Sequence, residues 1–139
     1  MESSDRKPVP IVDASSAPYW RAAVDGRLLI QHCEACNDFQ FYPRAHCVHC
    51  GALSPEWHDA TGRGIVHTFS VIYRNGVPAF DVDLPYALAI VELEEGPRMT
   101  ANIIGVDPES VYIGMPVRVT FQPVSEEIAI PQFTPEAPR

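Results

Sequence analysis

The chain has 139 residues and a formal net charge of −8, with one lysine, Lys7, against nine arginines. Proteins that bind nucleic acid gain most of their affinity from cationic contacts to phosphate, so this composition argues against a general nucleic-acid binder. The chain contains no apolar run of 18 residues, and residues 1–10 lack the apolar segment of a signal peptide. We therefore expect a cytoplasmic protein with no membrane span, whose cysteines stay reduced.

The first element expected is a short helix within residues 15–28, after a loose, proline-broken arm over residues 1–15. Ser15 or Ser16 is placed to cap this helix, Pro18 fits its first turn, and Gly26 follows its end. Its predicted apolar face consists of Tyr19, Trp20, Ala23 and Val24. Residues 27–33 then predict a strand that leads into the first cysteine.

All four cysteines follow in two Cys-x-x-Cys pairs, Cys33 with Cys36 and Cys47 with Cys50, separated by ten residues. Four thiolates in this pattern predict a closed, structural zinc site. Gly51, directly after the second pair, supplies the permissive turn that such a site needs. The module has few large apolar residues, so metal binding is expected to supply its folding energy.

Other interpretations of the four cysteines account for the pattern less well. Two disulfides need an oxidising compartment, and a dithiol redox centre uses only one pair. A mononuclear iron site has the same ligands, so the sequence leaves the choice between zinc and iron open. His32, His46 and His49 are expected to flank the metal site, not to bind the ion.

Five strands are expected after the cysteines, within residues 62–75, 86–93, 98–106, 116–123 and 125–133. One face of the first strand is predicted to carry Ile65, His67 and Phe69. The ring nitrogens of His67 are expected to find hydrogen-bond partners inside the barrel. Val117, Val119 and Phe121 are predicted to point inward from the fourth strand. Five short strands favour a small Greek-key barrel of the oligonucleotide/oligosaccharide-binding (OB) type over a sandwich, which usually has about seven.

The expected organisation is mainly β. It comprises an N-terminal arm and helix (1–27), a zinc ribbon (28–60), an OB-fold barrel (61–133) and a flexible tail (134–139). The unpatterned segment 74–85 joins the first two barrel strands, and its length marks it as functional or mobile. No Gly-rich phosphate loop, G-x-S-x-G or H-E-x-x-H motif occurs. His58 and Asp59 are a candidate acid/base pair, but the side chains of sequence neighbours often point apart. The absence of a catalytic set favours a binding or partner subunit.

Several segments occur together in one order: YWRAAVDGRLLIQHC, the two cysteine pairs around FYPRA, GRGIVHTFSV, PYALAIVELEEG and IGMPVRVTF. In this the chain resembles the acyl-CoA-associated zinc-ribbon/OB-fold family, formerly a domain of unknown function. The resemblance runs from about Tyr19 to Phe121. It implies a rubredoxin-like ribbon with structural zinc, followed by an OB-fold barrel.

The resemblance also implies a function. Members of the family are partner subunits in heteromers with thiolase-fold enzymes, thiolases or steroid side-chain aldolases, that act on acyl-CoA thioesters. The partner carries the catalytic residues, and the small subunit helps to bind the CoA substrate and stabilises the complex.

Four residues are candidates for contact with CoA or with the partner. Arg44 matches the aromatic-Pro-Arg segment of the family, and Arg63 lies between two glycines. Phe80 and Tyr86 are placed to line an acyl channel from the 74–85 segment. The alternative function is a single-stranded nucleic-acid binder on an OB fold, which the acidic charge and the scarcity of cationic residues disfavour.

Overall fold

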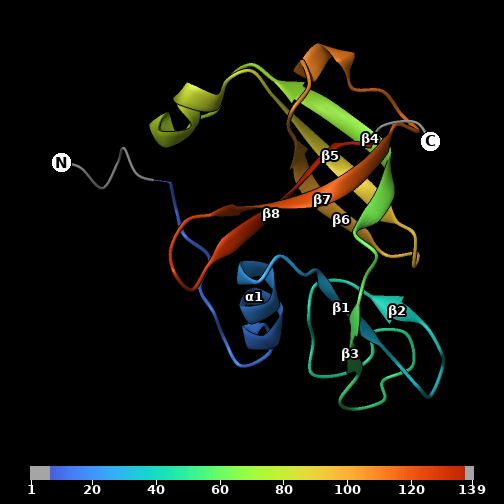
Figure 1. Ribbon diagram of the computed structural model, residues 1–139. Helices are drawn as coiled ribbons and strands as arrows, with labels where there is room; N and C mark the ends of the chain where they lie inside the picture. Colours follow the sequence, from blue (N-terminus) through green and yellow to red (C-terminus); the bar gives the residue numbers. More distant parts are fainter. Residues whose placement is uncertain (1–6, 137–139) are drawn as a thin grey trace.

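The computed structural model describes residues 7–136, which form a helix, a three-stranded ribbon and a closed five-stranded barrel (Figure 1). The helix and the ribbon lie below the barrel in this view. The elements in chain order are α1 (Ala17–Val24), β1 (Leu29–His32), β2 (Phe39–Gln40), β3 (Glu56–Asp59), β4 (Arg63–Ile72), the 3-10 helix η2 (Pro78–Asp83), β5 (Tyr86–Leu93), β6 (Arg98–Ile103), the 3-10 helix η3 (Pro108–Ser110), β7 (Pro116–Pro123) and β8 (Ala129–Pro135). Within the described residues no helix is long and apolar enough to cross a membrane.

Helix α1 begins after Ser16, with Pro18 in its first turn, and Gly26 follows its end with φ of +80°. The side chain of Ser16 does not cap the helix directly. The Ser16 hydroxyl instead accepts from the backbone N–H of Asp13 at 3.2 Å, and the Asp13 carboxylate accepts from the N–H of Ser16 at 2.9 Å. These reciprocal bonds form a turn that leads into the helix.

The buried face of α1 consists of Tyr19, Ala22 and Ala23, which differs in part from the predicted face. Val24 is 42% exposed, so its predicted place on the apolar face is wrong. Residues of an α-helix advance by about 100° each, and Val24 therefore points roughly 140° away from Tyr19. The initial six residues of the predicted arm lie outside the described residues.

The ribbon is an antiparallel sheet in the order β2-β1-β3. Strand β1 pairs with β2 through Gln31 opposite Gln40, and with β3 along its whole length from Leu29 to His32. The first cysteine pair follows β1, and the second follows β2. Strand β1 is central in the sheet, so it joins β2 to β3.

The barrel closes in the order β4-β5-β6-β8-β7, which confirms the predicted five-stranded OB-type barrel. Val117 is fully buried, and Val119 and Phe121 pack against the core, as predicted. Strand β8 continues to Pro135, so its last two residues fall in the segment that the sequence assigned to a tail.

One hydrophobic core joins the barrel to the rest of the chain. Phe133, Val66 and Val91 are fully buried at its centre. Tyr19 from the helix and Ile30 from the ribbon belong to the same cluster. The ribbon and the barrel are therefore packed against each other as one folded body.

A break in strand pairing changes the interior face of β4. The pairing with β5 shifts between Val66 and Thr68, which is the signature of a β-bulge. Val66 is buried before the bulge, and Phe69 packs against the core after it, so His67 lies outside the barrel and is exposed. The prediction of a satisfied histidine inside the barrel is wrong, because strict alternation does not hold across a bulge.

The barrel is joined most loosely between β6 and β8, which pair in parallel at Ile103 and Phe133. Along the same edge of β6, the backbone N–H of Thr100 donates to the hydroxyl of Tyr42 at 3.2 Å. Tyr42 belongs to the ribbon, so the ribbon covers part of this edge.

Candidate functional site

The four cysteine sulfurs form a compact cluster at one end of the ribbon. Every pair of the four Sγ atoms lies within 4.8 Å, and the Cys33–Cys50 and Cys36–Cys47 distances are both 3.6 Å. A tetrahedral ion with zinc–sulfur bonds of about 2.3 Å would place its sulfurs about 3.8 Å apart. The cluster therefore fits a four-thiolate zinc site that leaves no position for water.

Each cysteine pair is carried by a tight turn that ends in a residue with positive φ. The backbone N–H of Asn37 donates to the Cys33 carbonyl at 2.7 Å, and that of Gly51 donates to the Cys47 carbonyl at 2.9 Å. Asn37 has φ of +65° and Gly51 has φ of +82°. Glycine and asparagine are the residues that tolerate this conformation, so both turns are fixed by local sequence.

The thiols differ in how readily they ionise. Burial disfavours the Cys47 thiolate, but backbone groups of Cys50 and His49 stabilise it and lower the pKa of Cys47 to about 6. For Cys36, a backbone hydrogen bond from Asp38 favours the thiolate. Burial and the neighbouring sulfurs outweigh that bond and raise the pKa of Cys36 to about 12. A divalent ion bound by all four sulfurs replaces these protons, as thiolate coordination requires.

The histidines beside the cysteines have other partners or face solvent. His32 Nε2 lies 2.8 Å from Asn37 Oδ1, which ties β1 to the first turn. The side chains of His46 and His49 are exposed, and the backbone N–H of His49 donates to Cys47 Sγ at 3.3 Å. His58 packs its ring 5.0 Å from that of Phe39, while the carboxylate of Asp59 accepts from Arg27.

The two candidate arginines occupy different environments. Arg44 is exposed at the rim of the ribbon, where its Nη1 donates to the Pro43 carbonyl at 3.2 Å. Arg63 begins β4 and forms an ion pair with Glu136 at 3.2 Å. Arg63 thus sits where the ribbon joins the barrel and is already engaged by a carboxylate.

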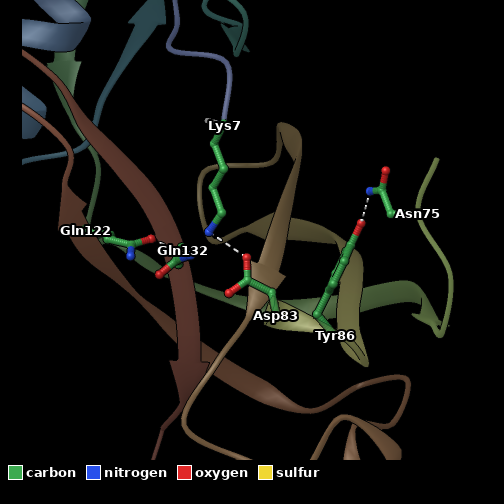
Figure 2. A network of polar contacts seen from close by, with 6 residues as sticks. All are labelled: Lys7, Asn75, Asp83, Tyr86, Gln122 and Gln132. Atoms are coloured by element: carbon green, nitrogen blue, oxygen red, sulfur yellow. Dashed lines mark hydrogen bonds and ion pairs between the residues drawn. The ribbon is translucent and has the colours of Figure 1, made fainter. Parts of the chain in front are cut away.

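Phe80 and Tyr86 lie at the far end of β4, around η2. Figure 2 shows the Tyr86 hydroxyl accepting a hydrogen bond from Asn75 Nδ2 at 2.8 Å. The Nζ of Lys7 lies 2.5 Å from Asp83 Oδ2 (Figure 2). The same Nζ lies 5.7 Å from the centre of the Phe80 ring. The sequence does not reveal this role of Lys7, because nothing local relates the N-terminal arm to this segment.

The four candidate contact residues do not form one cluster. The ten residues of β4 separate Arg63 from η2, and a strand of that length spans roughly 30 Å. Tyr86 begins β5 opposite Ile72, at the η2 end. Any surface that uses all four residues must therefore extend along the molecule.

Two family models match the chain in sequence. One, described as ChsH2, rubredoxin-like zinc ribbon domain, matches residues 20–56, and the other, ChsH2, C-terminal OB-fold domain, matches residues 57–122. A DUF35 domain-containing scaffold protein of Methanocaldococcus jannaschii is 36% identical over 78% of this chain and 77% of its own length. The chain belongs to the DUF35 family. The rubredoxin-like zinc ribbon and the four clustered sulfurs fit structural zinc as its metal.

Two further likenesses extend over most of the chain. A probable enoyl-CoA hydratase alpha subunit of Thermomonospora curvata is 35% identical over 96% of this chain. The chain spans only 41% of the length of that relative. A solved structure described as Ltp2-ChsH2(DUF35) aldolase has a chain 36% identical to this one, with a TM-score of 0.79. The match covers 91% of this chain and 98% of the solved one.

Proposed function

We propose that this chain is a non-catalytic partner subunit of a thiolase-fold enzyme, a thiolase or a steroid side-chain aldolase, that acts on acyl-CoA thioesters. The observation that carries the proposal is the match, at 36% identity and over 98% of the solved chain, to a chain of the Ltp2-ChsH2(DUF35) aldolase. The name of the Thermomonospora curvata relative, an enoyl-CoA hydratase alpha subunit, supports CoA thioesters as the substrate class.

The arrangement of ionisable groups supports a non-catalytic role. The four sulfurs fit a closed metal site, and such sites leave no position for a reacting water. The one adjacent histidine–carboxylate pair in the sequence does not act as a unit, since Asp59 pairs with Arg27 while His58 packs on Phe39. Catalytic groups are therefore expected on the partner enzyme.

A groove between the ribbon and the β5–β6 turn offers one place for a CoA thioester or a partner segment. Its volume is about 610 Å³, and its lining includes Phe39, Phe41 and Arg98. The aromatic rings suit the pantetheine arm. The Arg98 guanidinium is already paired with Glu92 at 3.0 Å, and Asp38 and Glu95 also line the groove, so the groove suits the arm better than the phosphates. Arg44 is exposed and is the one arginine among ribbon residues 28–60, and we assign it a contact with the partner or with CoA.

Co-expression tests this function directly. The tagged chain is expressed together with an aldolase of the Ltp2 kind and with thiolases, and the purified complexes are assayed for cleavage of acyl-CoA substrates. A stable heteromer that is active only as a complex is the expected result. An enzyme that is stable and fully active alone, and that never co-purifies with the chain, would refute the proposal. Salt-sensitive binding of single-stranded oligonucleotides would favour the alternative function.

Arg44 is tested within the same complex. Arg44→Ala should leave the fold intact but weaken CoA or partner binding roughly tenfold, as expected for the loss of one charge-assisted contact. Arg21→Ala, which alters an exposed arginine on α1, is the matched control. Equal affinities of the Arg44→Ala and unaltered chains for both ligands would remove Arg44 from the contact surface.

A further inference from the structure

Two glutamines are buried inside the zinc ribbon. Gln31 on β1 is 3% exposed and Gln40 on β2 is 5% exposed, and the two residues are opposite each other in the sheet. Among residues 7–136, no other amide, hydroxymethyl, imidazole or charged side chain is buried. A buried amide is stable only when its donors and acceptors are satisfied, so their partners define their role.

Gln31 holds the peptide backbone of Arg44 with both ends of its amide. Its Nε2 donates to the Arg44 carbonyl at 2.9 Å, and its Oε1 accepts from the Arg44 N–H at 2.9 Å. Rotating the amide by 180° would place oxygen against oxygen and N–H against N–H. The orientation of the side chain is therefore dictated by the backbone that it holds.

Gln40 holds the backbone on both sides of the third cysteine. Its Nε2 donates to the His46 carbonyl at 3.2 Å and to Gln31 Oε1 at 2.8 Å. Its Oε1 accepts from the N–H of Val48 at 2.8 Å. The residue between these two anchors is Cys47, so Gln40 fixes the metal ligand from its two neighbours.

The turn that carries the second cysteine pair is otherwise closed on itself. Cys47 N–H donates to the Ala52 carbonyl at 2.8 Å, and Ser54 N–H donates to the Ala45 carbonyl at 3.0 Å. Such bonds shape the turn but do not set its position relative to the first cysteine pair. The glutamine amides do set this position. Gln40 bonds both the turn and Gln31 Oε1, and Gln31 lies on β1, which leads into Cys33.

We propose that the Gln31–Gln40 pair positions the second cysteine turn for metal binding and fixes the Arg44 backbone to the same support. The ribbon then holds its sulfurs near their final separation without relying on the ion alone. Side chains that orient metal ligands commonly change metal affinity roughly 10- to 100-fold when they are altered. The proposal concerns the zinc site of this chain, so its test does not depend on any partner enzyme.

The test uses Gln40→Glu in the full zinc-loaded chain. This isosteric change removes both Nε2 donors and turns an oxygen toward Gln31 Oε1 and the His46 carbonyl. The rate of zinc transfer to a chromogenic chelator should rise roughly tenfold or more. The thiolate-to-metal absorption of the cobalt-substituted chain should also shift. Gln40→Met, which removes the amide without adding charge, should accelerate transfer in the same direction.

The matched control is Gln132→Glu. Gln132 donates to Gln122 at 3.2 Å in an exposed glutamine pair between β7 and β8 (Figure 2), so the chemistry of the change is the same at a site away from the metal. This control should keep the zinc-transfer rate and the cobalt spectrum of the unaltered chain.

Hydrogen exchange of β5 amides reports whether the barrel stays folded in each variant. Faster zinc transfer, or complete zinc loss, with a protected barrel supports the proposal. Unchanged transfer and spectra in both Gln40 variants would overturn it. Unfolding of the whole chain by both variants would also overturn it, since the pair would then be a general folding element.

Discussion

Replacing Gly64 by alanine should destabilise the barrel strongly, because backbone surrounds this position on both sides. Gly64 lies in β4 between Leu93 of β5 and Val117 of β7. A Cβ atom added there would lie 2.5 Å from the Glu92 carbonyl oxygen and 2.8 Å from Val91 Cγ1. All of these atoms belong to β5, which cannot retreat from β4 without opening the barrel.

The expected loss is about 3 kcal/mol, the upper part of the range for overpacked interiors, because the contacting atom belongs to the backbone. Guanidinium chloride unfolding at fixed zinc concentration, followed by circular dichroism, measures this loss. Gly76→Ala is the control, since a Cβ there meets nothing within 4 Å, and its stability should change by less than about 1 kcal/mol. A Gly64→Ala chain within about 0.5 kcal/mol of the unaltered chain would refute the reasoning.

Three further predictions concern the metal, the core and the surface. Cys47→Ser should lower zinc content and abolish amide-exchange protection in the ribbon, because a thiolate ligand is lost; retained zinc with full protection would contradict this. Phe133→Ala should cost about 3–5 kcal/mol in denaturant unfolding, since Phe133 is fully buried, and a loss under about 1 kcal/mol would contradict it. Lys7→Met should change stability by less than about 1 kcal/mol, because the side chains of Lys7 and Asp83 are 42% and 43% exposed; a larger loss in thermal unfolding would contradict it.

The parts of the fold that the sequence predicts correctly depend on short-range patterns. The two Cys-x-x-Cys pairs, with Gly51 after the second, specify the metal turns from a few adjacent residues. The alternation of Val117, Val119 and Phe121 likewise needs only one strand to show its inward face. These patterns identify the ribbon and the barrel without knowledge of how they pack.

The features that escaped prediction depend on pairing between distant segments. The bulge after Val66 reverses the interior face of β4, and the position of a bulge is set by the partner strand. The roles of Gln31 and Gln40 appear only when β1 and β2 are in register, because each amide bonds backbone from elsewhere in the chain. Lys7 pairs with Asp83 of η2 only because the fold brings together two segments that are distant in sequence.

The bond from Thr100 to the Tyr42 hydroxyl has a consequence for self-association. Exposed strand edges with unpaired N–H groups template aggregation, and the weakly paired edge of β6 is such a place. Because the ribbon supplies the acceptor, loss of zinc would uncover this edge as well as disorder the cysteine turns. Metal-depleted protein should therefore be prone to intermolecular β-pairing, which makes zinc supply a determinant of how long the chain stays monodisperse.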